Sequence, residues 1–272
     1  MRQKLGQHFL ANLAILKRIA SYADVKENDV VIEIGPGHGE LTEHIIHGAS
    51  RHAGIKIILI EKDKSLVVRL QTKFASPLKS GVVDIFGDDA LTLLPQIIDG
   101  LAKTKQSYKI VGNIPYYITG FLFRVISELA HKPSRCIFLI QKEVAERASA
   151  RPPHMNLLAA SVQYWADATM LDLVPRDSFS PSPDVDSAVI QLVTKHSAPV
   201  TPSDRYFECV KTLFKQPRKN LLNNLKGNTA FAKLSPQDAQ KIFESIGHKP
   251  TDRPQDMHIE SILLLAHLLY NE

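Results

Sequence analysis

Asn113, Ile114, Pro115 and Tyr116 form the segment of this chain whose residue types point most directly to chemistry. They follow an apolar run, Tyr108 to Gly112, that is typical of a buried strand. Asn carries a carbonyl acceptor, the residue before proline can turn its own carbonyl outward, and Tyr offers a flat face. These groups together suit a site that holds a planar base by its exocyclic amine. A tight turn with a core tyrosine is the alternative, and the segment alone does not separate the two.

A glycine-rich segment follows an earlier apolar run, Val30 to Ile34. The run ends in Glu33-Ile34, and Gly35, Gly37 and Gly39 come next at alternating positions. The spacing G-x-G-x-G differs from the G-x-G-x-x-G of dinucleotide sites. Glycines at the end of a strand allow the backbone to approach a ligand closely, and a helix is expected to begin immediately after them.

Two acidic positions follow further apolar runs. Glu61 comes directly after the run Lys56 to Ile60, 22 residues past Gly39, a spacing at which a carboxylate can accept from both hydroxyls of a ribose. Asp88 and Asp89 follow the run Val82 to Phe86, and a carboxylate there suits an adenine amine. Because ligands bind at the carboxyl ends of strands in a doubly wound sheet, we expect a nucleoside pocket beside a second pocket for a base.

The elements needed to position these residues alternate along the chain, which favours an α/β fold with a mostly parallel sheet and helices on both faces. Two later strands are expected to form an antiparallel pair at the sheet edge. The expected strands are 30–34, 56–60, 82–86, 108–112, 135–140, 168–174 and 187–193, and the expected helices are 12–22, 39–47, 63–74, 119–130, 141–150 and 155–165. The stretch 195–203 reads as a linker because it carries two prolines and two serines. Only helical patterns follow it, at 203–216, 218–226, 235–246 and 258–270, so we expect two domains, 1–198 and 199–272.

Composition narrows the class of protein. The chain has 272 residues, of which 44% are hydrophobic and 22% charged, as in ordinary globular proteins. Cys136 and Cys209 form no disulfide framework or zinc motif, and His44 and His47 lack a further ligand at metal spacing, so we expect no metal and a reducing compartment. No apolar run reaches membrane-spanning length, and residues 1–10 show no signal-peptide core.

Positive charge is concentrated late in the chain. The net charge is +5, whereas the segment Arg205–Lys233 alone carries seven basic residues and one acid, a net of +6. A basic helical segment of this kind is either a solvated face or a surface that binds phosphates, as in proteins that bind nucleic acids.

The motifs, in this order, make the chain resemble the small-subunit rRNA adenine N6,N6-dimethyltransferases. The similarity runs nearly end to end, and nine modest motifs in one order are highly specific. They are Lys4–Leu10 (KLGQHFL), Glu33–Gly39, Glu61-x-Asp63, Asp89-Ala90, Asn113–Tyr116, Gln141–Arg147 (QKEVAER), Phe179–Ser187 (FSPSPDVDS), Arg218-Lys219 with Leu222-Asn223, and Arg253-Pro254. The resemblance implies a Rossmann-like methyltransferase sheet, S-adenosyl-L-methionine as the methyl donor, and a small all-α C-terminal domain for RNA recognition.

The resemblance also implies a role for each matching residue. Asn113 and the carbonyl of Ile114, before Pro115, would hold the target N6 amine, and Tyr116 and Phe179 would stack on the two faces of the adenine. Glu61 would bind the ribose of the cofactor, Asp89 would bind its adenine amine, and Gln7 and His8 would form a lid over it. The other implied cofactor residues are Leu10, Glu33, Gly35, Gly37, Lys62, Asp88 and Asn113, and the implied RNA-binding residues are Arg147, Arg151, Lys211, Lys215, Arg218 and Lys219. We find no residue suited to be a general base.

As a function, the resemblance implies dimethylation of two adjacent adenosines in a hairpin loop near the 3′ end of small-subunit rRNA. The expected partner is rRNA within an assembling 30S subunit, and the expected protein is a cytoplasmic monomer. The alternatives are a 23S rRNA adenine methyltransferase of the macrolide-resistance type and a non-catalytic nucleic-acid-binding relative. The chain departs from the family at Pro217, which replaces a basic residue, and in the loop 152–160.

Overall fold

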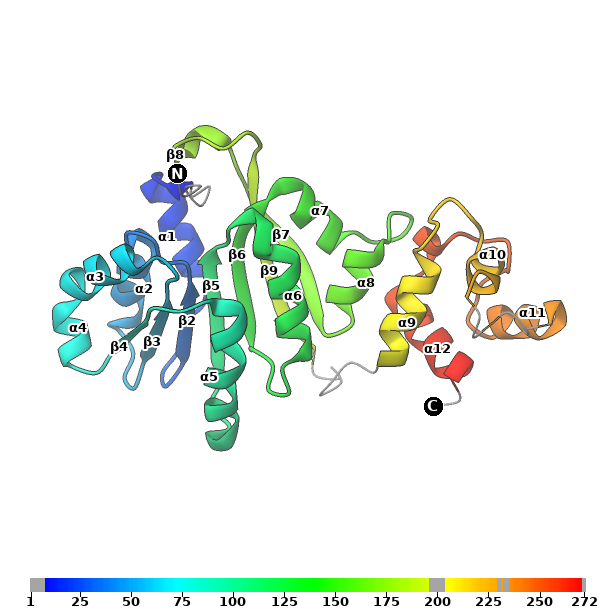
Figure 1. The fold of residues 1–272 in the computed structure, drawn as a ribbon, viewed down its shortest axis with the longest axis horizontal. Helices are drawn as coiled ribbons and strands as arrows, with labels where there is room; N and C mark the ends of the chain where they lie inside the picture. The colour runs from blue at the N-terminus through cyan, green and yellow to red at the C-terminus, as the bar shows by residue number, and fades with distance from the viewer. Residues whose placement is uncertain (1–7, 196–203, 229–230, 232–234, 271–272) are drawn as a thin grey trace. The chain divides into compact units, whose positions relative to one another are not determined.

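Seven strands form the central sheet in a computed structural model, which describes residues 8–195, 204–228, 231 and 235–270 (Figure 1). Their order across the sheet is β4-β3-β2-β5-β6-β9-β7. The four neighbouring pairs from β4 to β6 are parallel, and β9 runs antiparallel to β6. The strands are β2 (Val30–Ile34), β3 (Lys56–Ile60), β4 (Val83–Phe86), β5 (Tyr108–Asn113), β6 (Arg135–Gln141), β7 (Ala166–Val174) and β9 (Ser187–Thr194).

Helices cover both faces of this sheet, with α5 and α6 in front of it in Figure 1 and α1 and α2 behind it. The α/β fold expected from the alternating pattern is therefore confirmed. The helices of this part of the chain are α1 (Leu13–Tyr22), α2 (Glu40–Ala49), α3 (Lys64–Lys73), α4 (Ala75–Lys79), α5 (Ala90–Thr104), α6 (Thr119–Glu128) and α7 (Lys142–Ser149), with short 3₁₀ turns at Tyr116–Ile118 and Arg176–Ser178.

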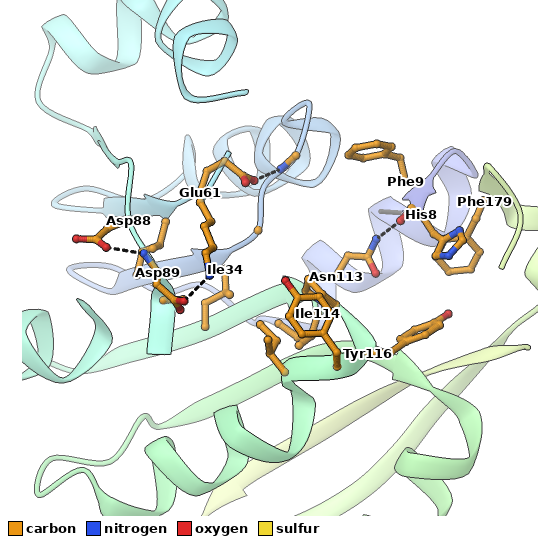
Figure 2. A pocket seen from close by; sticks show the side chains of 18 residues that line it. His8, Phe9, Ile34, Glu61, Asp88, Asp89, Asn113, Ile114, Tyr116 and Phe179 are labelled. Carbon is orange, nitrogen blue, oxygen red and sulfur yellow. Dashed lines mark hydrogen bonds and ion pairs between the residues drawn. The ribbon is translucent and has the colours of Figure 1, made fainter. Parts of the chain in front are cut away.

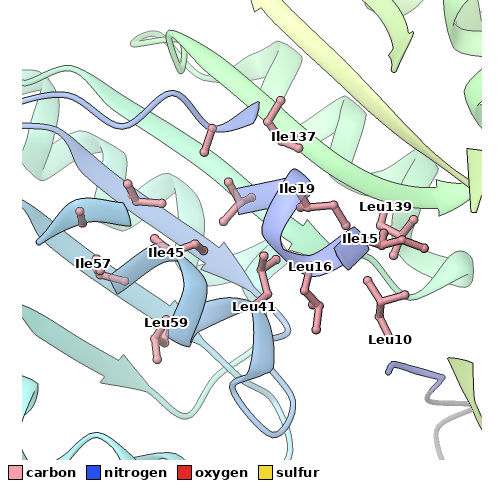
Figure 3. Packing of buried hydrophobic residues seen from close by; sticks show 14 of the residues in the cluster. Leu10, Ile15, Leu16, Ile19, Leu41, Ile45, Ile57, Leu59, Ile137 and Leu139 are labelled. Carbon is pink, nitrogen blue, oxygen red and sulfur yellow. The ribbon is translucent and has the colours of Figure 1, made fainter. Parts of the chain in front are cut away.

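The sheet is buried on both faces, so its strands lack the alternation of apolar and polar residues found in a sheet with one solvated face. All five residues of β2 are buried, which is the pattern of a parallel strand covered on both faces. One large cluster fills the layer between the sheet and α1 and α2 (Figure 3). It includes Ile15, Ile19 and Ile45 from the helices and Leu59 and Leu139 from the strands.

A second, two-stranded sheet joins the N-terminal segment to a distant loop. β1 (Phe9–Leu10) pairs antiparallel with β8 (Phe179–Ser180), so that Leu10 lies opposite Phe179 and Phe9 opposite Ser180. The amide of Ala11 extends the ladder by donating to Ser178 O at 2.8 Å. Segments 170 residues apart in sequence are thus fixed beside each other.

The helix α5 has no counterpart among the helices expected from the sequence. It begins at Ala90 after the N-cap Asp89, whose side chain accepts from the amide of Leu91 at 2.9 Å. Pro95 lies inside it, and a proline usually ends or kinks a helix because it removes one backbone donor. Here Leu94 and Ile98 are fully buried, so packing against the core outweighs the lost hydrogen bond.

The chain divides into two compact units, residues 1–145 with 167–194, and residues 146–166 with 195–272. The second unit contains α8 (Leu157–Gln163), α9 (Asp204–Leu213), α10 (Leu221–Lys226), α11 (Pro236–Ser245), a 3₁₀ turn (Pro254–Asp256) and α12 (Ile259–Tyr270). The sequence predicted a single boundary at 198/199, with residues 146–166 in the first domain. In the structure these residues belong to the second unit. They pack there because α8 contacts α9 and α12, and the Tyr206 hydroxyl donates to Ala160 O at 2.9 Å. No helix in the described parts of the chain is long and apolar enough to cross a membrane.

Asn224, a buried residue of the second unit, organises the turn between α9 and α10. Its Nδ2 donates to the carbonyls of Gln216, Lys219 and Asn220, each at 3.1 Å, and its Oδ1 accepts from the amide of Gln216 at 3.1 Å. Asn220 in turn caps α10 by accepting from the amide of Asn223 at 2.9 Å. One buried amide therefore fixes the loop 216–220.

Glu33 is a buried acid in the middle of the core strand β2. Burial raises the pKa of its carboxyl to about 8, and the Thr42 hydroxyl, which donates to Glu33 Oε2 at 2.7 Å, opposes this rise. The group is therefore neutral at pH 7 in the folded protein and ionised in the unfolded chain, where its ordinary value is 4.5.

Replacing Glu33 by Gln should make the stability of the protein less dependent on pH. The folded state binds the Glu33 proton more tightly than the unfolded state does, so wild-type stability falls as the pH rises from 4.5 to about 8. The full loss is roughly 4–5 kcal/mol, and roughly 3–4 kcal/mol of it falls between pH 5 and pH 8. Denaturant unfolding at pH 5 and pH 8 measures it. Glu33→Gln keeps the acceptor for Thr42 and should remove most of the difference, whereas Glu27→Gln, at an exposed acid, should leave it intact. Equal slopes for wild type and Glu33→Gln would contradict the assignment.

Candidate active site

One pocket lies where the parallel strands β2, β3 and β5 end at their carboxyl edge (Figure 2). Its empty space is about 940 Å³ when the open solvent at its mouth is included. Residues from six separate segments line it: His8 and Phe9; Ile34, Gly35 and Gly37; Ile60, Glu61 and Lys62; Asp88, Asp89 and Ala90; Asn113–Ile118; and Phe179.

The glycine loop passes beneath this pocket in a conformation that favours glycine. Gly35 and Gly37 have φ angles of 66° and 61°, which side chains rarely adopt. A Cβ built on Gly37 would lie 2.9 Å from the ring of Phe9, so the loop and the N-terminal segment are packed too closely for any side chain. Phe9 also contacts the ring of His38, with centroids 4.2 Å apart. Gly35 and Gly37 both line the pocket.

Glu61, at the end of β3, stands beside that loop as a buried acid. Its Oε2 accepts from the amide of Gly37 at 3.1 Å, and its Oε1 accepts from the amide of Asp63 at 2.9 Å. Burial raises the pKa of Glu61, and these two amide donors oppose the rise. Each carboxylate oxygen can accept a further hydrogen bond, so the residue can receive two adjacent hydroxyls.

Asp89 lies after β4, on the other side of Glu61 from the glycine loop in Figure 2. Its Oδ1 caps α5, while its Oδ2 pairs with Lys62 Nζ at 2.8 Å. The Lys62 hydrogen bond holds the pKa of Asp89 below its ordinary value. Asp88 supports the turn, because its Oδ1 accepts from the amide of Asp89 at 2.7 Å. The Asp89 carboxylate is thus ionised and fixed at the pocket edge.

Asn113 ends β5 with its side chain in a defined orientation. Its side-chain amide contacts the backbone carbonyl of His8 at 2.9 Å. A carbonyl only accepts, so the contact uses Nδ2, and Oδ1 keeps its capacity as an acceptor. The next residue, Ile114, donates its amide to Leu139 O at 3.0 Å and buries its side chain.

Tyr116 follows in the 3₁₀ turn, and its phenol is anchored to the buried Ser187 of β9. The two hydroxyl oxygens lie 2.8 Å apart. Burial raises the pKa of Tyr116, so the phenol is neutral. The ring of His8 faces that of Tyr116, with centroids 6.3 Å apart and an angle of 24° between the planes.

Phe179 lines the same pocket and also belongs to the hydrophobic core, with 6% of its surface exposed. It is held there by β8, through its pairing with Leu10. His8 and Tyr116 line the same pocket. The aromatic groups expected from the sequence are therefore gathered in one place.

Three residues that the resemblance places at the cofactor lie elsewhere or outside the described residues. Leu10 and Glu33 do not line the pocket: Leu10 packs in the core cluster and Glu33 is hydrogen-bonded to Thr42 behind the glycine loop. Both were assigned from their motifs, yet their side chains point to the core. Gln7 lies outside the described residues.

The residues expected to bind RNA all belong to the second unit. Arg147 and Arg151 lie at and just after the end of α7, Lys211 is in the last turn of α9, and Lys215, Arg218 and Lys219 lie in the segment before α10. All six are exposed.

Phe9 and Tyr117 line the pocket, although sequence reasoning assigned them no role. Phe9 lies in the Lys4–Leu10 motif, between His8, which also lines the pocket, and Leu10, which packs in the core. Tyr117 directly follows the segment Asn113–Tyr116, and 57% of its surface is exposed. Within the described residues, no group of three or more His, Cys, Asp or Glu side chains is arranged to hold a metal ion.

Comparison with known proteins gives matches along the whole chain. The family model described as ribosomal RNA adenine dimethylase matches residues 1–263. A protein named ribosomal RNA small subunit methyltransferase A from Dehalococcoides mccartyi is 33% identical over 276 residues, covering 100% of this chain and 89% of that protein. The protein of the same name from Geobacillus kaustophilus is 34% identical, covering 98% and 90%.

Solved structures of two transferases are similar to this chain over nearly its whole length. A dimethyladenosine transferase from Plasmodium falciparum superposes with a TM-score of 0.76 at 26% identity, covering 97% of this chain and 98% of that one. The 23S rRNA methyltransferase ErmE shares the fold, with a TM-score of 0.71 at 22% identity and coverage of 96% and 99%. The full-length matches in sequence and family model show that the chain belongs to the ribosomal RNA adenine dimethylase family, whose members are methyltransferases.

Proposed function

We propose that the protein transfers methyl groups from S-adenosyl-L-methionine to the N6 atoms of two adjacent adenosines near the 3′ end of small-subunit rRNA, giving N6,N6-dimethyladenosine. Its substrate is the rRNA of an assembling 30S subunit, and it acts in the cytoplasm as a monomer. The observation that carries the proposal is the meeting of the Asn113 acceptor and the Tyr116 ring with Glu61 and Asp89 in one pocket.

The residues present suit the proposed methyl donor. The positive-φ loop at Gly35 and Gly37 lines the pocket without side chains, and Glu61 offers acceptors for two ribose hydroxyls. The ionised Asp89 offers an acceptor for an adenine amine. His8, Lys62 and Asp88 complete the proposed cofactor site at its edges. When bound, S-adenosyl-L-methionine supplies a methyl group on a cationic sulfur that is already activated for displacement.

Asn113 orients the amine that attacks. The lone pair of the adenine amine is delocalised into the ring, and acceptors on its two hydrogens draw it toward a pyramidal, nucleophilic geometry. Asn113 Oδ1 and the carbonyl of Ile114, ahead of Pro115, are the proposed acceptors. In each transfer the N6 amine held by these acceptors would give up one proton to solvent. Positioning supplies much of the rate, which fits a site without a general base.

Tyr116 provides the stacking surface that makes an extruded base stable. A base taken out of its stack costs a few kcal/mol, which stacking on aromatic side chains offsets. Phe179 is proposed to contribute to the other face. The hydrogen bond from Tyr116 to Ser187 fixes the ring before a base arrives.

The exposed basic residues of the second unit are proposed to bind the RNA backbone. Lys211, Lys215, Arg218 and Lys219 fall within nine positions, and Arg147 and Arg151 belong to the same unit. Basic side chains of this kind position a nucleic acid through its phosphates without selecting its sequence. The structural similarity to ErmE concerns the fold, so the choice between small- and large-subunit rRNA is left to direct measurement.

Purified protein with labelled S-adenosyl-L-methionine should convert unmethylated small subunits to the dimethyladenosine form. Nucleoside analysis of the digested rRNA measures the product, and each small subunit should accept four methyl groups, two on each adenosine. Unmethylated large subunits serve as the control substrate. Transfer only to large-subunit RNA would replace the proposal by the macrolide-resistance type of activity, and no transfer to either RNA would favour a non-catalytic relative.

Changing Asn113 to Ala should abolish turnover without abolishing cofactor binding. Loss of one preorganised polar group that acts on the reacting atom costs roughly 10²–10³-fold in kcat. Single-turnover kinetics measure the transfer step, and equilibrium titration measures affinity for S-adenosyl-L-methionine. Asn12→Ala, which removes only the cap of α1, is the matched control for a lost Asn side chain. A parallel loss of affinity and turnover would count against the proposed role.

Changing Lys211, Lys215, Arg218 and Lys219 to Gln should weaken RNA binding and flatten its dependence on salt. Each lost phosphate contact lowers the slope of log K against log salt concentration by about 0.7–0.9. The control changes four exposed lysines of the first unit, Lys17, Lys79, Lys103 and Lys105, to Gln, so that the net charge is matched. If both variants show the same slope, the basic segment is a solvated face.

A further inference from the structure

The C-terminal end of α7 is held by a side chain of α8. The last carbonyls of a helix have no partner within it and must accept hydrogen bonds from elsewhere. Gln163, the last residue of α8, donates from Nε2 to Ala148 O at 3.0 Å and to Ala150 O at 2.8 Å. Ala148 belongs to the last turn of α7, and Ala150 is the first residue after that helix. One amide therefore ties the end of α7 and the start of the loop 150–156 to α8.

Gln163 is buried in a way that packing alone does not explain. None of its surface is exposed, and its Oε1 accepts no hydrogen bond from the described parts of the chain. A buried acceptor without a donor is unfavourable, and an apolar side chain of similar length would avoid that loss. An apolar side chain could not hold two carbonyls, however, so the contacts of Nε2 account for an amide at this position.

Backbone hydrogen bonds fix the loop that follows. The amide of His154 donates to Arg151 O at 2.7 Å, and the amide of Met155 donates to Gln255 O at 3.1 Å. The backbone at Arg151 is thus held on one side by the carbonyls that Gln163 binds and on the other side by these two bonds.

Arg151 is exposed and is the main source of positive charge in this loop. It is the only Lys or Arg between residues 148 and 175. Phosphate contacts set the register and orientation of a protein on a nucleic acid. The direction in which Arg151 leaves the end of α7 therefore decides which phosphate its guanidinium reaches, and Gln163 sets that direction.

We propose that Gln163 is a positioning residue for RNA binding, which directs Arg151 toward a phosphate of the rRNA by holding the carbonyls of Ala148 and Ala150. This inference rests on the proposed function and extends it to a side chain that is too deeply buried to touch RNA. Because Gln163 acts through Arg151, it contributes to the affinity for RNA and leaves the transfer step unchanged.

Gln163→Met removes both donors while keeping a side chain of similar length. The dissociation constant for unmethylated small subunits should rise on the order of threefold to tenfold, as for the loss of one phosphate contact. The value of kcat at saturating subunits and the dissociation constant for S-adenosyl-L-methionine should each change less than twofold. Gln106→Met is the matched control, because it removes a glutamine donor to the carbonyl of Asn28 in the first unit, and it should leave RNA affinity unchanged.

A double-mutant cycle with Arg151 separates positioning from a general structural role. Arg151→Gln should weaken RNA binding and lower the slope of log K against log salt concentration by about 0.7–0.9. Adding Gln163→Met to Arg151→Gln should then weaken binding no further, since the side chain that Gln163 positions is already gone. If Gln163 only stabilises the fold, the two effects on affinity multiply.

Multiplied effects overturn the inference, as does an unchanged affinity for RNA in either single variant. A fall of kcat in Gln163→Met as large as its loss of affinity also overturns it. Thermal unfolding verifies that each variant is folded at the temperature of measurement, and Gln163→Leu is a second apolar variant for which the same outcomes hold. Methyl transfer by the wild-type protein tests the proposed function itself, so a failure of that function is read separately from a failure of the Gln163 assignment.

Discussion

The hydrogen bond between Asn113 Nδ2 and the carbonyl of His8 is the contact on which the orientation of the Asn113 acceptor depends. It joins the end of the central strand β5 to the N-terminal segment, which in turn pairs with the strand that carries Phe179. His8 and Asn113 are 105 residues apart, and Phe179 lies a further 66 residues along the chain, yet all three line one pocket. The same bond uses the donor half of the Asn113 amide, so the side chain meets a ligand as an acceptor only.

Electrostatics give the two acidic groups of the pocket different characters. Glu61 is surrounded by protein and receives two amide donors, and burial raises its pKa. Asp89 is paired with Lys62, which lowers its pKa. Both sit at strand ends in a protein whose net charge is positive. The Asp89 carboxylate is therefore ionised beside the Lys62 ammonium, whereas burial favours the protonated form of Glu61.

The sequence was most informative where a side chain must lie at the end of a strand. β2 and β3 match their expected bounds, and Glu61, Asp89 and Asn113 reach the same pocket because parallel strands end at one edge. Membership of a motif was a weaker guide to which side chains line the pocket, because neighbouring residues in a strand point to opposite faces. Phe9 faces the pocket while Leu10 and Glu33 face the core.

Other features depended on contacts that no local pattern reveals. The helix α5 forms despite Pro95 because its apolar face is buried, and residues 146–166 join the later helices through the packing of α8. The relation of His8 to Tyr116 arises from two segments separated by more than 100 residues. Spacing along the chain predicted which groups gather, but the distances and orientations between them follow from tertiary structure.

In the loop 216–220, the buried side-chain amide of Asn224 orders a stretch of backbone whose own side chains are exposed. Asn224 closes this loop with four hydrogen bonds, and Arg218 and Lys219 extend from it. Fixing a residue costs about 1–2 kcal/mol of backbone conformational entropy. For these residues that cost is met when the protein folds, so a phosphate that binds there encounters a backbone already ordered, and less of the interaction free energy is lost to ordering.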